Sequence, residues 1–215
     1  MTRSISAVAA VLFAALWPAV FSGCRTSPPP NFYHLTPLSS VAADGDAVDL
    51  SLGVGPVELP PYLDRSQIVT TDGKNLLDLA EFHQWAEPLQ GNIRRVLAEN
   101  LSLLLGTERV AQFPWKRDFE VDYQLLVDVM RFEGTMVSEA TLVGEEMASS
   151  ECVLVARWTV QDADGQPVIP ATKSRIPGTA NGPGYTEMVE ALNRILEQFS
   201  RDVADRIRAL PAPGS

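Results

Sequence analysis

Thiols and imidazoles are scarce in this chain of 215 residues, which contains two cysteines, Cys24 and Cys152, and two histidines, His34 and His83. A cysteine-rich metal cluster is therefore excluded, because such clusters need several closely spaced thiolate or imidazole ligands. The sequence also lacks the H-E-x-x-H, G-x-S-x-G, S-x-x-K and P-loop motifs that mark common catalytic sites. We therefore expect no cofactor, no metal site and no enzymatic activity.

His83 and the pair Glu145-Glu146 are the remaining candidates for chemistry. No residue close in sequence would orient the His83 imidazole as a general base, so we expect His83 to be a half-buried sheet residue. Glu145 and Glu146 could chelate calcium, but a solvated acidic turn is the simpler interpretation. A hydrolase that uses His83 is the weakest of the functions that the sequence leaves open.

Positive charge is also in short supply, with 17 lysines and arginines against 27 aspartates and glutamates and a formal net charge of −10. Loss of residues 1–23, whose one charged residue is Arg3, would change this to −11. An acidic domain is repelled by phosphate backbones, so nucleic acid is a poor partner. An anionic membrane surface would repel it too, so attachment to a membrane would need a lipid.

No hydrophobic run is long enough to cross a bilayer, which takes about 20 predominantly apolar residues. The uncharged stretch 5–20 is shorter and is interrupted by Pro18. Arg3 precedes this stretch, and two small residues, Ser22 and Gly23, follow it. This order is typical of a signal peptide, which we assign to residues 1–23.

The residues Phe21-Ser22-Gly23-Cys24 resemble the bacterial lipobox, in which the cysteine is acylated, for example with palmitate, and becomes the first mature residue. The alternative is an ordinary secretory signal with Cys24 as a spare thiol. The lipobox is favoured because residues 24–31 are proline-rich, as expected of an extended tether. Two or more acyl chains would anchor the protein stably. Arg25 stands where aspartate typically retains a lipoprotein in the inner membrane, so we expect the periplasmic face of the outer membrane.

Residues 32–215 are expected to form one α+β domain, a largely antiparallel sheet with two principal helices packed on it. Period-two alternation and apolar runs between turn signals predict strands at 32–36, 50–59, 67–71, 75–79, 109–113, 121–132, 153–160 and 168–176. Asp72-Gly73 and Asp164-Gly165 are typical hairpin turns. Cys152, at the head of an apolar strand, is expected to be a small buried residue. Pro167 and Pro170 would confine the last strand to a sheet edge.

Two segments have helical periodicity. The segment 88–105 has one apolar face, with Pro88 in its first turn and Gly106 as its C-terminal cap. The segment 186–210 is longer, and its pairs Glu190–Arg194, Glu197–Arg201 and Asp202–Arg206 have the i,i+4 spacing of surface ion pairs. We expect this last helix to cover the sheet rather than to form a coiled coil with a partner.

The segment 55–65 contains three prolines that would stiffen a loop. Its candidate partner-binding residues are Pro60, Pro61, Tyr62, Asp64 and Arg65. A stiff loop with a tyrosine and an arginine suits recognition, because little ordering entropy is lost on binding. The equally weighted alternative is a structural crossing in which Asp64 and Arg65 satisfy each other.

Four stretches and the final helix resemble one known family, in order and over nearly all of the mature chain. The stretches are Tyr33-His34-Leu35-Thr36-Pro37, residues 54–69, Trp85-Ala86-Glu87-Pro88-Leu89 and Val127-Asp128-Val129-Met130-Arg131-Phe132-Glu133-Gly134. They are similar to the PqiC family, the auxiliary lipoproteins of ABC-type and MCE-domain envelope transport systems. The link 135–151 is longer than this resemblance leads us to expect.

The resemblance implies a non-enzymatic role in trafficking phospholipids or other hydrophobic molecules, which maintains membrane integrity. The implied partner is an MCE-domain protein that projects from the inner membrane into the periplasm as a lipid-conducting tube. A second copy of the same chain is a further partner that the sequence leaves open. The alternative function is a periplasmic-face carrier lipoprotein that holds an acyl chain between sheet and helices.

Overall fold

The computed structural model describes residues 27–40, 47–72, 74–135 and 150–211. Cys24, Arg25 and the signal peptide lie outside these ranges, as does most of the link 135–151 with Glu145 and Glu146. The described elements are β1 (Asn31–Tyr33), β2 (Leu52–Glu58), β3 (Gln67–Thr71), β4 (Leu77–Trp85), α2 (Leu89–Leu105), β5 (Val110–Gln112), β6 (Tyr123–Thr135), β7 (Glu151–Asp162), β8 (Pro167–Thr179) and α3 (Tyr185–Arg208).

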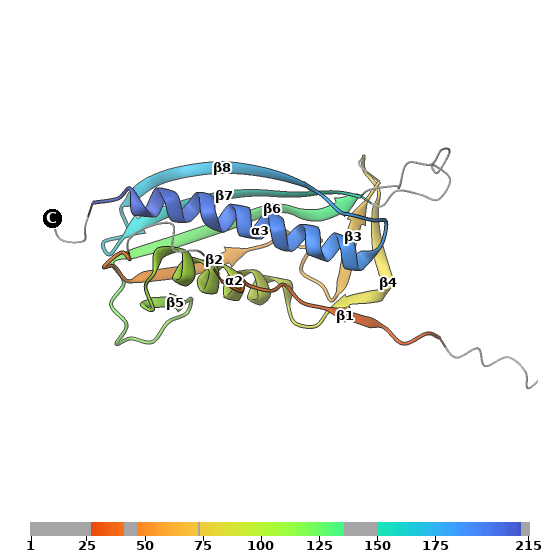
Figure 1. Cartoon of the computed structure of the whole chain (residues 1–215), viewed down its shortest axis with the longest axis horizontal. Coiled ribbons are helices and arrows are strands. Elements are labelled where there is room, and N and C mark those ends of the chain that lie inside the picture. The colour runs from red at the N-terminus through yellow and green to blue at the C-terminus, as the bar shows by residue number, and fades with distance from the viewer. Residues whose placement is uncertain (1–26, 41–46, 73, 136–149, 212–215) are drawn as a thin grey trace, which may run out of the picture.

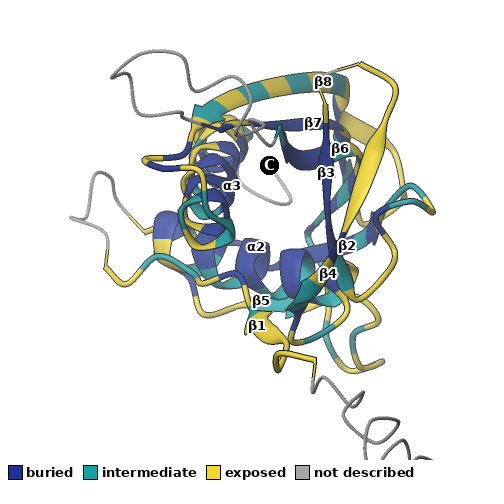
Figure 2. Ribbon diagram, turned by 90° about the vertical axis from the view of Figure 1, so that its right-hand side faces the viewer, coloured by how far each residue is buried: buried dark blue, intermediate teal, exposed yellow. Residues whose placement is uncertain are grey.

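The eight strands form one sheet that curls around the two helices (Figures 1 and 2). Strand β6 is its branch point, because one edge pairs first with β2 and then with β3, while the other edge pairs with β7. Beyond β2 lies β5, beyond β3 lie β4 and β1, and beyond β7 lies β8. The sheet is therefore split on one side of β6 and continuous on the other.

The fold class agrees with the α+β prediction of a sheet with two helices packed on it. The long ladders β6–β7 and β7–β8 and the hairpin β3–β4 are antiparallel. Four shorter ladders, β1–β4, β2–β5, β2–β6 and β3–β6, are parallel and were not predicted. Within the described chain β8 pairs with β7 alone, so it is the edge strand that its two prolines indicated.

Side chains from both layers fill the space between the sheet and the helices. Trp158 of β7 and Phe199 of α3 meet edge to face, with ring centroids 6.3 Å apart. Phe132 of β6 is also fully buried, and the guanidinium of Arg206 lies 5.7 Å from the centroid of the Trp158 ring. Burial of this apolar surface supplies the main stabilisation of the domain.

Two glycines let α3 approach the sheet closely. A Cβ atom on Gly134 of β6 would lie 2.7 Å from the Met188 side chain, and one on Gly178 of β8 would lie 2.7 Å from Ile195. Real Cβ atoms do not approach that closely, so a larger residue at either position would force the Met188 or Ile195 side chain out of its place under α3.

The last helix covers the sheet, as predicted, and does not present its apolar face to solvent. Of its three predicted ion pairs, Glu197–Arg201 forms, with 2.9 Å between nitrogen and oxygen. Arg194 instead donates a hydrogen bond to the carbonyl of Thr179, and Arg206 lies over Trp158. In the described part of the chain, neither helix has the length and apolar character needed to span a bilayer.

Cys152 is buried beneath α3, as the sequence indicated. Burial raises the pKa of its thiol to about 11, because the charged thiolate is disfavoured away from water. This cysteine is therefore a structural residue, protonated and unreactive at neutral pH.

Replacement of a buried residue of α3 should destabilise the domain far more than replacement of its exposed neighbour. We expect Leu196→Ala or Phe199→Ala to lower the free energy of unfolding by about 2–5 kcal/mol, because each leaves a cavity under the helix. Glu197→Ala, which removes a surface ion pair, should cost about 0.5 kcal/mol or less. Urea denaturation followed by circular dichroism measures all three, and equal small losses would show that α3 is not packed on the sheet.

Candidate functional site

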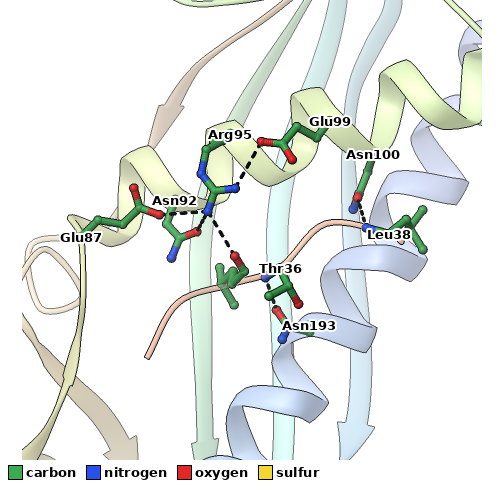
Figure 3. A network of polar contacts seen from close by, with 9 residues as sticks. Thr36, Leu38, Glu87, Asn92, Arg95, Glu99, Asn100 and Asn193 are labelled. Carbon is green, nitrogen blue, oxygen red and sulfur yellow. Dashed lines mark hydrogen bonds and ion pairs between the residues drawn. The ribbon is translucent and has the colours of Figure 1, made fainter. Parts of the chain in front are cut away.

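The chain that follows the predicted tether is held between the two helices (Figure 3). After β1 it continues without a strand partner, so its backbone groups need hydrogen bonds from elsewhere. The amide of Thr36 donates to Oδ1 of Asn193 on α3 at 3.1 Å, and the amide of Leu38 donates to Oδ1 of Asn100 on α2 at 2.8 Å. Leu35 between them is fully buried.

Arg95 of α2 holds the same segment as well. Its Nη2 donates to the carbonyl of Leu35 at 3.2 Å, to Oδ1 of Asn92 at 3.0 Å and to Glu87 at 2.9 Å (Figure 3). Nη1 pairs with Glu99 at 3.2 Å. The hydrogen bond that Arg95 donates to Glu87 is the main cause that raises the pKa of Arg95.

Asn100 connects the N-terminal segment, α2 and α3 in the interior. Its Nδ2 donates to Oγ of Ser200 on α3 at 3.0 Å, while its Oδ1 accepts the amide of Leu38. Ser200 in turn donates to the carbonyl of Leu196. Because these groups are buried, an unmade bond would cost about 1–3 kcal/mol. The start of the folded domain is therefore fixed to both helices.

The proline-rich loop presents some of its predicted binding residues and buries others. Pro61, Asp64 and Arg65 are exposed, and among the described residues no ion pair joins Asp64 to Arg65. Pro60 and Tyr62 are half-buried. Leu63 is buried, and its amide donates to the carbonyl of Pro60 at 2.9 Å, which closes the turn.

Tyr62 is attached to a buried carboxylate that the sequence did not reveal. Its hydroxyl donates to Oε2 of Glu133 at 2.7 Å, and Nε of Arg131 donates to Oε1 of the same residue at 2.6 Å. The amide of Phe132 also donates to Oε2 at 3.2 Å. Glu133 is 3% exposed, so these donors replace the water that a free carboxylate would bind.

The two interpretations of the loop, as a structural crossing and as a recognition element, apply to different residues. Tyr62 and Leu63 fix the loop to the sheet, while Asp64 and Arg65 remain available at its surface. Burial and the nearby Glu133 carboxylate raise the pKa of Tyr62, because both disfavour the phenolate. The sequence contains one sign of a special position at Glu133. The alternation of apolar and polar residues breaks at Arg131-Phe132-Glu133, where charged residues flank a core phenylalanine.

His83 lies half-buried on β4, as predicted. Its Nδ1 is 2.8 Å from the hydroxyl of Tyr33, and its ring stacks on Tyr185 with centroids 4.1 Å apart. The three rings join β1, β4 and the first residue of α3. This is a packing cluster that an imidazole completes.

Surface depressions are present as well. One of about 430 Å³ lies beside β5 and is lined by Ala111, Gln112, Pro114, Trp115, Lys116, Asp118 and Phe119. Another of about 200 Å³ lies beside the strands β2, β6 and β7, with Asp128 and Arg157 among its lining residues. Neither contains the metal-ligating clusters that catalysis commonly uses, and no such cluster occurs among the described residues.

The described chain is one α+β domain, with two helices packed on a curled sheet and a core filled by side chains. Residues 33–204 match the model of the family described as ABC-type transport auxiliary lipoprotein component, and the chain belongs to this family. It is an auxiliary lipoprotein of a transport system, and its family is not a class of enzymes.

Two curated relatives and two solved structures are similar to the chain. The intermembrane transport lipoprotein PqiC of Escherichia coli (strain K12) is 28% identical to this chain over 208 residues. The match covers 94% of this chain and 97% of that protein. PqiC of Shigella flexneri matches with the same identity and coverage. A Xanthomonas campestris crystal structure has a TM-score of 0.67 at 15% identity, covering 82% of this chain and 94% of its own. A crystal structure of an uncharacterized protein has a TM-score of 0.63 at 22% identity, covering 84% and 99%. The two structures show the same fold.

Removal of the Tyr62 hydroxyl should destabilise the domain by leaving the buried Glu133 carboxylate with one donor fewer. We expect Tyr62→Phe to lower the free energy of unfolding by about 1.5–3 kcal/mol at neutral pH, while Arg65→Ala changes it by about 0.5 kcal/mol or less.

The difference between the wild type and Tyr62→Phe should depend on pH in one direction. The folded-state pKa of Tyr62 is raised. The contribution of its hydroxyl to the free energy of unfolding is therefore complete below the unfolded pKa of about 10, and it is lost as the pH rises further. Denaturation at pH 7 and at alkaline pH measures this, and a difference that grows above pH 10 would contradict the assignment.

Proposed function

We propose that this chain is an outer-membrane lipoprotein, anchored at Cys24 on the periplasmic face, that docks the end of an inner-membrane-derived MCE-domain conduit. The transported molecules would be phospholipids or other hydrophobic compounds, and the process would maintain membrane integrity. Family membership and similarity to an intermembrane transport lipoprotein over 94% of the chain support a role in such a system.

The filled interior is the observation that carries the docking role. A carrier would need a space for an acyl chain between sheet and helices, and in the described domain Trp158, Phe132 and Phe199 occupy that region with less than 2% of each side chain exposed. A closely packed core of this kind has no room for an acyl chain without rearrangement. Docking on an outer surface requires no internal space.

The loop residues Asp64 and Arg65 are the proposed docking contacts. Both are exposed on a turn held in place by Leu63 and by the Tyr62–Glu133 bond, so little ordering entropy is lost when a partner binds. Pro60 and Pro61 stiffen the same turn. Tyr62 contributes by positioning the loop, since its hydroxyl is directed into the domain.

Anchoring is tested by replacement of the lipid-bearing residue. Cys24→Ser should abolish incorporation of radioactive palmitate in growing cells and leave the precursor uncleaved, or release a soluble form if another peptidase cuts it. The control is Cys152→Ser, which should leave the labelling intact because that thiol is buried. Undiminished labelling of Cys24→Ser would refute the lipoprotein assignment.

Docking is tested by exchange of the two loop charges. The variant Asp64→Lys with Arg65→Glu should reduce co-purification with the MCE-domain protein by about tenfold or more, because rim charges that attracted the partner then repel it. Arg117 and Asp118 are an exposed adjacent pair elsewhere, so Arg117→Glu with Asp118→Lys is the matched control.

Both charge-exchange variants should melt within a few degrees of the wild type. Co-purification that falls equally in both would indicate a general charge effect. Undiminished co-purification of the loop variant would place the docking surface elsewhere.

A further inference from the structure

Half of the exposed large apolar side chains of the described chain lie at one end of the molecule. The described chain has eight, and four of them lie on β1 or at the β3–β4 hairpin. Phe32 is 62% exposed, and the hairpin leucines Leu76, Leu77 and Leu79 are 66%, 42% and 43% exposed. Leu77 and Leu79 lie on the same face of β4, because they oppose Thr71 and Val69 in one uninterrupted antiparallel register.

The predicted tether enters the domain at this same end. β1 pairs in parallel with β4, with Asn31 opposite His83, so the chain before Asn31 and the start of β4 approach from the same side. Figure 1 shows the N-terminal end of β1 and the β3–β4 hairpin at one end of the long axis, while the C-terminal end of α3 lies at the other.

The predicted tether is long enough for Cys24 and the exposed apolar residues to reach the same membrane surface. Asn31 lies seven residues after Cys24, and a polyproline helix of seven residues is roughly 22 Å long. Leu79 and Leu76 lie four and seven residues before His83, strand distances of about 13 and 23 Å at most. A bilayer that holds an acyl chain on Cys24 is therefore within reach of Phe32 and of the hairpin leucines.

The charges around the hairpin select the kind of membrane. Asp72, Lys74, Asp78 and Glu81 are all exposed, and together they carry a net negative charge. Anionic headgroups would repel them, whereas zwitterionic headgroups would not. The apolar contact is therefore favoured on a zwitterionic surface.

We propose that Phe32 and the hairpin leucines form a lipid-facing surface that rests on the bilayer in which Cys24 is anchored. The inference rests on the proposed anchoring at Cys24 and adds a second contact with the membrane. That contact would set the orientation of the domain, since two separated points of attachment restrict its tilt where one flexible tether does not.

The first test measures partitioning of a protein that carries one acyl chain. A single myristoyl chain binds membranes with only about 10⁴ M⁻¹, so the contribution of the domain is measurable beside it. In the mature chain, residues 24–215, a myristoyl-maleimide should react at Cys24 and spare Cys152, which is buried. Binding to phosphatidylcholine vesicles is then followed by sedimentation.

The triple variant Leu76→Ser, Leu77→Ser, Leu79→Ser should bind these vesicles about tenfold more weakly than the wild type. Leu103→Ser is the matched control, because Leu103 is 46% exposed in the last turn of α2. Figure 1 shows that end of α2 beside β5, at the opposite end of the molecule from the hairpin, so vesicle binding of this variant should be unchanged. The wild type should bind phosphatidylcholine better than phosphatidylglycerol. Equal binding of the wild type and the triple variant would overturn the proposal.

A second test does not depend on how the triple variant folds. Leu76→Trp should give additional blue-shifted emission that lipids with brominated acyl chains quench, whereas Leu103→Trp should not. Emission from the tryptophan at position 76 that is insensitive to brominated lipid would overturn the proposal, as would quenching that is equal at both positions.

Failure of this inference is distinguishable from failure of the proposed function. Because the acyl chain is attached chemically, the vesicle results do not depend on acylation in the cell. Loss of palmitate labelling tests the anchor by itself. If the triple variant binds vesicles normally and loses the MCE-domain protein instead, the leucines form a protein contact and the membrane proposal is wrong.

Discussion

One irregularity in the central strand, β6, decides which of its side chains face the helices. Between Val129 and Arg131 the register of β6 against β7 shifts by one residue, which leaves Met130 as a bulge. Before this bulge Val127 and Val129 face the helices, and after it Phe132 and Gly134 take over that face. A strand without the bulge would direct Arg131 and Glu133 into the core, because one residue of slip exchanges the two faces.

The bulge also links the core to the loop. By placing Arg131 and Glu133 on the outer face, it sets the buried carboxylate beneath Tyr62. The loop therefore takes its position from β6, although it is distant from that strand in sequence. Because the sheet splits into β2 and β3 beside β6, it has an edge at that point. The loop that connects β2 to β3 crosses at this edge.

Local patterns predicted most elements, because they depend on residues close together in the chain. Alternation placed β6 and β7, the aspartate-glycine pairs placed two hairpins, and three- and four-residue spacing placed α2 and α3. The parallel pairings of β2 and β3 with β6 could not be predicted, since no local pattern specifies which distant strand lies alongside. The return strand after Asp72 was predicted to end at Leu79, but β4 continues to Trp85 through an irregular register that alternation does not reveal. For the candidate site, sequence identified the loop but not Glu133, whose burial depends on donors supplied by the fold.

The attachment of the N-terminal segment has a mechanical consequence. A pull on the N-terminal end of β1 along the strand axis would load the hydrogen bonds between β1 and β4 in shear, so that they resist together instead of opening one after another. Behind β1 the load passes to Arg95, Asn100 and Asn193, which divide it between α2 and α3. A force applied to the N-terminal segment is therefore supported finally by the two helices rather than by the sheet edge.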